Sequence, residues 1–126
     1  MASPADTKAL IEGAVTRFLD EVTALAPLKL VVGLELRGRG DVQMYRIELP
    51  GPKVTKDVAS DAKVRVEVPR AFFNEMAKDG KAADWQEAFV HGQAKATGVE
   101  QILRLIAHVV ERHEERLRTR KARPAR

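Results

Sequence analysis

The chain contains no cysteine among its 126 residues. Disulfides, thiolate nucleophiles and cysteine-ligated metals are therefore excluded. No apolar run approaches the roughly 20 residues that cross a bilayer. The N-terminus also lacks the basic-then-apolar pattern of a secretory signal, and the C-terminus lacks a peroxisomal Ser-Lys-Leu-type address. Together these absences favour a cytoplasmic protein, and a bacterial source fits them.

Aromatic residues are scarce at 5%, with one tryptophan and one tyrosine. Hydrophobic residues nevertheless make up 44% of the chain and charged residues 32%, which is ordinary for a globular protein. The length corresponds to one domain. A domain of this size buries about two-thirds of its unfolded surface, so it can hold a substantial core.

Acidic residues are absent from the last eleven positions. Six of the 22 basic residues lie there, which leaves 16 basic against 18 acidic residues in the rest of the chain. The positive charge is therefore local, and we expect no nucleic-acid binding by the folded domain. We expect a domain at 1–117 and a disordered basic tail at 118–126. The tail either attracts an anionic membrane surface or stays solvated.

Helical periodicity predicts long amphipathic helices near both ends of the chain. The first covers Ser3–Leu25, with Ser3 and Asp6 in a capping box, and Pro27 ends it. The last begins after Gly98 and keeps its apolar stripe as far as Leu117. Core packing is the interpretation we favour for the first helix, because its acidic residues would resist an anionic bilayer.

Alternating residues predict strands between these helices, at Leu28–Arg37, Val42–Leu49 and, as a weak edge strand, Lys53–Val58. The segment Arg37–Asp41 is glycine-rich, but it lacks the spacing of a phosphate-binding loop and predicts a hairpin turn. The strands with the clearest pattern have one apolar and one charged face. An α+β fold with helices on one side of the sheet follows from that pattern.

The stretch Asp61–Gly98 predicts a strand, a helix, a short helix and a strand. Pro69 opens the first of these helices, and Asp79-Gly80 ends it, with the glycine expected in the left-handed conformation. Asp84 with Glu87 is expected to cap the short helix. The final strand alternates small apolar residues with polar ones.

This stretch resembles the sterol carrier protein type-two-like (sterol-binding domain) family. The resemblance is carried by the strand AKVRVEV, the helix PRAFFNEMAKDGK and the segment EAFVHGQAKATG, and it extends more weakly over Leu10 to Leu117. It implies a five-stranded mixed sheet with helices on one face. It also implies an apolar cavity between the two layers that takes sterols, fatty acids, fatty acyl-CoA or other lipids. Two departures from the family pattern are the small Ala94 and Ala96, and His91 in place of a frequent glutamine.

By this resemblance the protein binds an apolar ligand without a covalent step and shields it during transfer. The residues that the resemblance places around the ligand are Tyr45, Ile47, Phe73, Met76, Trp85, Phe89, Ala94, Ala96, Leu103, Ile106 and Val110. For any one of the aromatic residues taken alone, simple core packing is the interpretation we favour, and a lining role is the alternative. For the two alanines we favour a hollow that holds ligand, and close packing of a helix on the sheet is the alternative.

The sequence predicts no catalytic residue, no cofactor and no metal site. His108 and His113 are five residues apart, which misses the spacing of two helical metal ligands. His91 is a conceivable general base, but no nucleophile or orienting acid can be assigned to it. Two other functions stay open. One is an accessory or interaction subunit with a closed cavity, and the other is a lipid-modifying enzyme that uses His91. The sequence does not indicate an oligomeric state.

Overall fold

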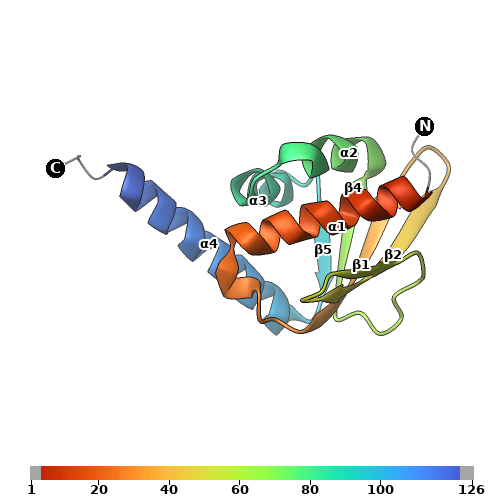
Figure 1. Cartoon of the computed structure of the whole chain (residues 1–126), viewed down its shortest axis with the longest axis horizontal. Helices are drawn as coiled ribbons and strands as arrows, with labels where there is room; N and C mark the ends of the chain where they lie inside the picture. The colour runs from red at the N-terminus through yellow and green to blue at the C-terminus, as the bar shows by residue number, and fades with distance from the viewer. Residues whose placement is uncertain (1–3, 123–126) are drawn as a thin grey trace.

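The computed structural model describes residues 4–122, which form a five-stranded sheet and the helices packed on it (Figure 1). Apolar alternation produces the strands and 3.6-residue periodicity the helices. In chain order the elements are α1 (Pro4–Glu21), the 3-10 turn η1 (Thr23–Leu25), β1 (Leu30–Arg37), β2 (Val42–Leu49), β3 (Lys53–Thr55), β4 (Val64–Pro69), α2 (Arg70–Asp79), α3 (Ala82–Val90), β5 (Lys95–Gly98) and α4 (Glu100–Ala122).

The sheet is mixed, with the strand order β3-β2-β1-β4-β5. β1 and β4 run parallel, and the other neighbouring strands are antiparallel. The hairpin predicted at Arg37–Asp41 joins β1 to β2, with Arg37 paired to Val42. The predicted α+β class and the five-stranded mixed sheet are thereby confirmed.

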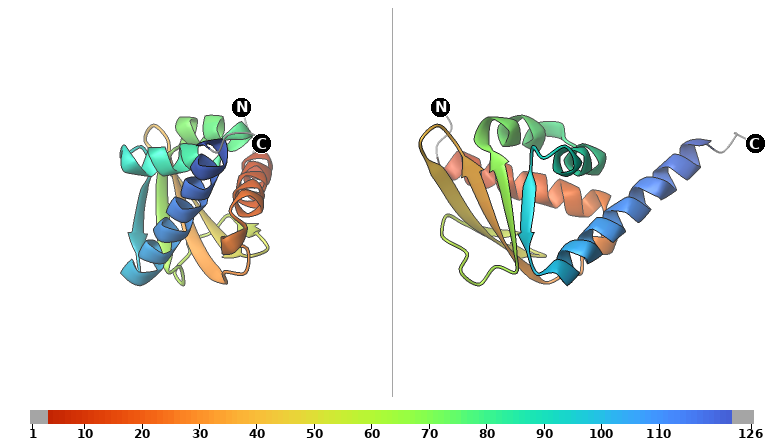
Figure 2. Two further views of the ribbon diagram at one scale, coloured as in Figure 1. Left: turned by 90° about the vertical axis from the view of Figure 1, so that its left-hand side faces the viewer. Right: turned by 180° about the vertical axis from the view of Figure 1, so that it is seen from behind.

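The register lines up the apolar positions of the strands on one face. Leu34 pairs with Tyr45 on one side and Val66 on the other, and Val66 pairs with Ala96. Since paired residues point to the same side of a sheet, these four side chains form one row across the inner face. Helices α1, α2 and α3 lie on that face, as the view from behind makes clear (Figure 2).

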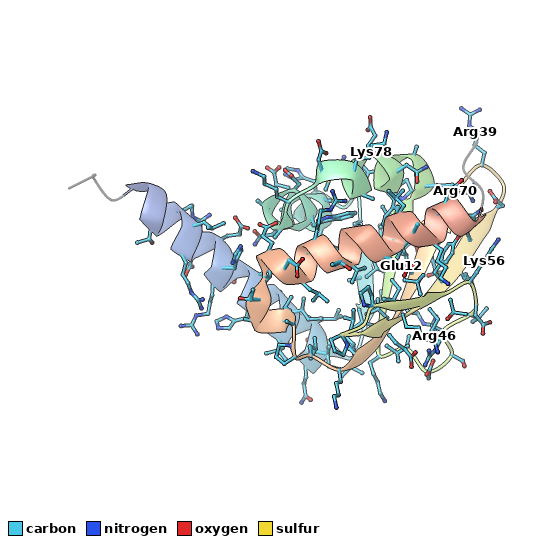
Figure 3. All side chains as sticks on the ribbon, viewed as in Figure 1. Glu12, Arg39, Arg46, Lys56, Arg70 and Lys78 are labelled. Atoms are coloured by element: carbon cyan, nitrogen blue, oxygen red, sulfur yellow. The ribbon has the colours of Figure 1, made fainter. Side chains whose placement is uncertain are left out.

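The main cluster of buried residues joins α1 and α2 to the sheet. Ile11 and Leu36 are fully buried there, and Phe73 of α2 is 5% exposed. Arg17 of α1 donates a hydrogen bond to the backbone carbonyl of Lys78 in α2, which ties the two helices together. Charged side chains such as Lys56 and Lys78 point outward from the body (Figure 3). These buried residues hold α1 and α2 in place beside the site described below.

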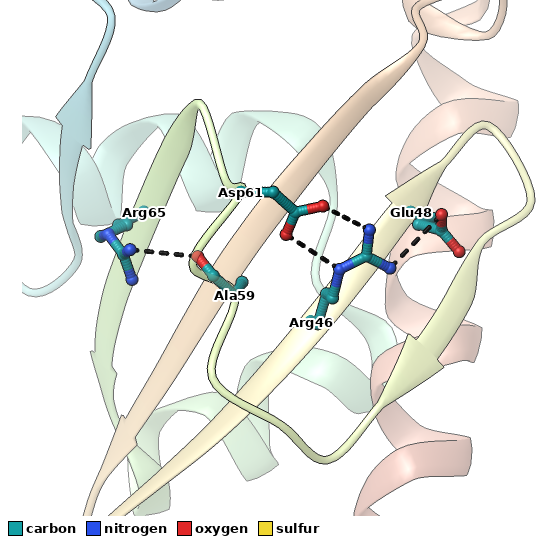
Figure 4. Close-up of polar contacts among 5 residues, drawn as sticks. All are labelled: Arg46, Glu48, Ala59, Asp61 and Arg65. Carbon is teal, nitrogen blue, oxygen red and sulfur yellow. Dashed lines mark hydrogen bonds and ion pairs between the residues drawn. The ribbon is translucent and has the colours of Figure 1, made fainter.

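The outer face of the sheet is crossed by the loop 56–63, which connects β3 to β4. Arg46 binds Asp61 of the loop, and Arg65 donates a hydrogen bond of 3.0 Å to the carbonyl of Ala59 (Figure 4). A Cβ atom at Gly33 would lie 3.4 Å from the Cβ of Ala59, so the absence of a side chain lets the loop lie flat on the sheet. The sequence did not reveal this cover.

The ends of helices α1 and α3 differ from the predictions. α1 ends at Glu21, and the chain continues to Leu25 as a single 3-10 turn; the expected cap at Ser3 lies outside the described residues. α3 begins at Ala82, so Asp84 sits in its first turn and accepts a hydrogen bond from the Lys81 N–H at 2.9 Å. The carboxylate caps the helix, but from the third helical position.

Gly80 ends α2 for a different reason from the one expected. Its φ is −61°, so it does not adopt the left-handed conformation. A Cβ atom at Gly80 would instead lie 2.5 Å from the carbonyl oxygen of Met76. The glycine is needed because the chain passes so close to the preceding turn of the helix.

α4 continues to Ala122, five residues past the expected end of the ordered domain. Arginine and lysine are good helix formers and are favoured at a helix C-terminus. The structure assigns 118–122 to this helix, and the disorder expected at 118–126 stays a prediction; residues 123–126 lie outside the described part. The far end of α4 extends beyond the body (Figure 1). Within residues 4–122, no helix has the length and apolar character that crossing a membrane requires.

Candidate functional site

A large hollow of about 430 Å³ lies between the sheet and helices α1, α3 and α4. Its floor is formed by inner-face residues of β1, β4 and β5, and its walls by one side of each helix. The lining residues are Phe18, Val32, Val64, Val66, Ala82, Trp85, Gln86, Phe89, Val90, Ala96, Leu103, Ile106, Ala107, Val110 and Glu111. We refer to this space as the larger hollow.

A smaller hollow of about 230 Å³ adjoins it under α1. Six residues line both spaces, so the two are neighbouring parts of one apolar region. The residues that line the smaller hollow are Ile11, Ala14, Val15, Phe18, Leu19, Leu25, Leu28, Leu30, Val32, Leu34, Ile47, Leu49, Val66, Val68, Phe73, Trp85, Phe89 and Ile106. All of these side chains are apolar.

The larger hollow exists because the layers do not close over β5. All four residues of β5 are exposed, including Ala96, although that side chain points to the inner face. Small side chains on this strand provide no volume to meet α4. The partner of Ala96 on the neighbouring strand, Val66, is half-buried, and Val64, which pairs with Gly98, is 3% exposed, so burial increases from β5 to β4.

Aromatic rings of α3 form the wall between the two hollows. Trp85 lines both of them, and its ring centroid lies 5.9 Å from that of Phe73, with the planes tilted by 47°. Tilted ring pairs at this separation attract one another, so Phe73 fixes the orientation of the tryptophan. Phe89, one turn further along α3, also lines both hollows and is 38% exposed. The fluorescence of the Trp85 indole should therefore change when a ligand enters either hollow.

Eight of the eleven predicted residues line one or both hollows: Ile47, Phe73, Trp85, Phe89, Ala96, Leu103, Ile106 and Val110. The other three lie elsewhere. Tyr45 and Ala94 are each 1% exposed within the core cluster. The Met76 side chain folds toward Gly80, where an added Cβ would be 3.3 Å from its methyl group. Tyr45 and Ala94 are enclosed by their neighbours and Met76 is half-buried against its own helix, so none of the three lines either hollow.

Several lining residues were not predicted. Phe18 comes from α1, while Val32 and Val66 come from β1 and β4. The apolar periodicity of each element predicted that these three side chains point inward. We interpreted them as core residues and not as residues that line a cavity. Periodicity shows which side of an element is buried, and it does not show where the opposite layer stands back.

Apart from the indole N–H of Trp85, the polar side-chain groups that line the larger hollow belong to Gln86 and Glu111. Gln86 projects from α3 and Glu111 from α4, so they approach the space from two walls. No serine, threonine, lysine or histidine lines either hollow. The site can therefore hold an apolar body and form hydrogen bonds at one region of its edge. His91 lies exposed at the C-terminal end of α3 and lines neither hollow.

No protein-family model matches the chain, and no curated protein matches its sequence. Solved structures do match its shape. The sterol carrier protein domain 2 of Helicoverpa armigera aligns with a TM-score of 0.58 and 16% identity, covering 89% of this chain and 92% of its own. This chain has the sterol carrier fold. Palmitated SCP2L2 from Aedes aegypti aligns with a TM-score of 0.55 and 19% identity, covering 79% and 93%.

A third match with the sterol carrier fold is the ubiquinone synthesis protein UbiJ-SCP2. It aligns with a TM-score of 0.52 and 18% identity, covering 90% of this chain and 96% of its own. In all three cases nearly the whole matched domain corresponds to this chain. Identities this low establish the fold, so the function is argued below from the geometry of the hollows.

Proposed function

We propose that this protein binds a hydrophobic small molecule in the joined hollows and carries it between sites as a non-catalytic lipid-binding protein of the cytoplasm. The observation that carries the proposal is the larger hollow, about 430 Å³ in volume and lined almost wholly by apolar side chains. Ligand sites in proteins commonly measure about 300–1,000 Å³. A sterol carrier fold around that space, and the palmitated state of the Aedes aegypti protein, support the same function.

The driving force is the removal of apolar surface from water. Each Å² of apolar ligand surface that leaves water contributes about 25 cal/mol. Only the surplus over the cost of association appears as affinity. We therefore expect long-chain and polycyclic ligands to bind in the micromolar range, and short chains to bind much more weakly.

A neutral polar head is favoured over an anionic one. Gln86 can donate or accept a hydrogen bond, whereas the Glu111 carboxylate accepts only. Glu111 is exposed at the edge of the larger hollow, and a carboxylate or phosphate placed beside it would meet a like charge, a repulsion that water weakens but does not abolish. We propose a ligand with a hydroxyl or carbonyl head, such as a sterol or a long-chain alcohol, ahead of free fatty acids and acyl-CoA.

We infer a carrier and not an enzyme because the residues that line the hollows include no nucleophile paired with a base. A hydrolytic or transfer reaction on a bound lipid needs a nucleophile or an activated water held by a base. Glu111 is the single ionisable residue among those that line the hollows, and no partner for it lies there. Binding and release are then passive steps.

Native mass spectrometry of the purified protein, followed by solvent extraction, tests the proposal directly. We expect a bound apolar mass that extraction removes. Titration of the stripped protein with cholesterol, hexadecanol, palmitate and palmitoyl-CoA should change the emission of Trp85, which lines both hollows. Protein that carries no lipid and shows no spectral or thermal shift with any of these classes would contradict the proposal. That result would support the alternative of an accessory subunit with a closed cavity.

A further inference from the structure

Three potential metal ligands converge at the junction of α1, α3 and α4. They are Glu21 at the last position of α1, and His113 and Glu114 on α4. One ligand atom from each lies within 4.8 Å of the other two. All three residues are half-buried, which distinguishes them from acidic clusters on an open surface.

Two of these atoms are enclosed without a hydrogen bond. In the described part of the chain, neither Nε2 of His113 nor Oε1 of Glu114 has a hydrogen-bond partner. Nε2 of His113 lies 3.6 Å from Oε2 of Glu21, which is beyond hydrogen-bond distance. An enclosed polar atom without a partner costs free energy. A cation between these atoms would satisfy both at once.

Glu21 is already held in position for such a role. Its Oε1 accepts a hydrogen bond of 2.9 Å from the Ala82 N–H, at the first residue of α3. The other oxygen, Oε2, is the one that faces His113. Metal-binding carboxylates are commonly fixed by a second hydrogen bond of this kind, which orients the free oxygen.

The distances suit a small divalent ion after a minor adjustment. Zinc binds histidine nitrogen and carboxylate oxygen at about 2.0–2.2 Å, so two ligands at tetrahedral corners lie about 3.3 Å apart. The separation of 3.6 Å between His113 and Glu21 is close to this value. The remaining separations among the three ligand atoms do not exceed 4.8 Å, so small side-chain movements would bring all three onto one ion. Calcium and magnesium prefer oxygen ligands only, and so they fit the imidazole poorly.

We propose that Glu21, His113 and Glu114 bind one Zn²⁺ ion, with a water molecule as the fourth ligand, and that the ion fastens the end of α1 to α4. The site borders the larger hollow. Phe18 precedes Glu21 by one turn, Val110 precedes His113 by one turn, and Ala82 is hydrogen-bonded to Glu21; all three line that space. Bound zinc would thus fix the wall formed by α4 relative to α1.

Equilibrium dialysis against ZnCl₂, with metal analysis and a thermal melt, tests the site without reference to any ligand. The wild-type protein should bind one equivalent of zinc and melt at a higher temperature with it. Three variants, His113→Ala, Glu114→Gln and Glu21→Gln, should each weaken binding at least about ten-fold, in line with the loss of one metal ligand. Glu21→Gln retains an oxygen for the Ala82 N–H, so it removes the charge and leaves the helix start intact.

Matched controls stand on the same helix. His108→Ala and Glu115→Gln alter the same residue types at exposed positions of α4 and should leave zinc binding unchanged. Cobalt substitution gives a second readout, since Co²⁺ in a four-coordinate site absorbs strongly in the visible range. Zinc binding that survives His113→Ala, or that falls equally in His108→Ala, would overturn the proposal. If His113→Ala does not fold, unchanged binding by Glu114→Gln and Glu21→Gln would overturn it equally.

Discussion

Arg46 and Asp61 form two parallel hydrogen bonds, from Nε to Oδ1 at 3.0 Å and from Nη2 to Oδ2 at 2.6 Å (Figure 4). Arg46 belongs to β2 and Asp61 to the loop 56–63, so the pair fastens the loop to the outer face of the sheet. Hydrogen bonds from the guanidinium hold the pKa of Asp61 below its usual range. Glu48 adds a further ion pair to Arg46 at 3.3 Å.

This pairing predicts a pH-dependent contribution to stability. The pKa of Asp61 is lower in the folded chain than in the unfolded chain, where about 3.9 is normal. The stabilisation is then complete above about pH 4 and is lost as the pH falls through the folded value. Asp61→Asn should lower the urea midpoint at neutral pH, and the difference from wild type should narrow on acidification. A difference that stays constant down to about pH 2 would contradict this reasoning.

Asp20→Asn provides the control for that measurement. Asp20 is exposed on α1, away from the loop. The substitution removes the same charge and should leave the urea midpoint nearly unchanged at both pH values. A loss of stability equal to that of Asp61→Asn would mean that net charge, and not the pairing with Arg46, is responsible.

Ala94 and Ala96 make a matched pair for testing the larger hollow. The two residues are separated by one position at the start of β5. Ala94 is 1% exposed and belongs to the core cluster, whereas Ala96 lines the larger hollow. Ala94→Leu should force its neighbours apart and cost about 1–3 kcal/mol of stability. Ala96→Leu should fill open space, so that stability holds or rises while affinity for an apolar ligand falls.

Denaturant midpoints and ligand affinities measured on both variants decide the matter. Equal destabilisation by the two substitutions would mean that Ala96 is packed as closely as Ala94. The proposed ligand position beside β5 would then be wrong. The smaller hollow under α1 would be the remaining candidate for the ligand site.

Glu111→Gln tests the choice of head group. Removing the charge should strengthen palmitate binding relative to hexadecanol, because the like-charge repulsion disappears while the hydrogen-bonding shape remains. The ratio of the two affinities is the quantity to measure, since any general loosening of the site affects both ligands. Glu115→Gln, one turn further along the exposed side of α4, is the control. An unchanged ratio would remove Glu111 from ligand selection.

His91→Ala tests the absence of catalysis. His91 is exposed and lines neither hollow, so its loss should change ligand affinity by no more than a few-fold. Incubation of the wild-type protein and the variant with lipid esters, followed by mass spectrometry, should reveal the same unaltered ligands. Turnover that the wild-type protein performs and the variant does not would show that the protein is an enzyme.

Removal of residues 118–126 tests the membrane interaction expected of the basic tail. Each basic residue close to an anionic surface is worth about 1 kcal/mol. Truncation after Leu117 should abolish salt-sensitive binding to phosphatidylserine liposomes and leave ligand affinity intact. Liposome binding that is unchanged by the truncation would indicate a solvated tail without a role at the membrane.

The sequence was sufficient for the faces of the longer strands because alternation fixes which residues point inward, whereas β3, expected at Lys53–Val58, ends at Thr55. β2 was predicted with its observed bounds, and the inward positions of β1 and β4 were correct, since a one-residue slip would have placed charges such as Glu35 in the core. Helix ends were harder to predict. The end of α2 depends on the distance between Gly80 and Met76, which is a property of the folded backbone.

The site was only partly predictable for a related reason. Aromatic residues of α3 stood out in the sequence, whereas the contribution of Phe18 depends on how far α1 stands from the sheet. The cluster with His113 was hidden for the same reason. Its partner Glu21 is 92 positions earlier in the chain, and only the crossing of two helices brings them together.

The larger hollow also bears on how long the protein survives in a cell. Side chains around it have few neighbours on one side, so the empty protein forgoes contacts that a ligand restores. A ligand that binds only the folded state stabilises it, by about 2.7 kcal/mol at a hundred-fold excess over the dissociation constant. Proteases act on the unfolded fraction. Under the proposed function, starvation for the ligand should therefore deplete the protein itself, and the amount of protein would follow the supply of its ligand.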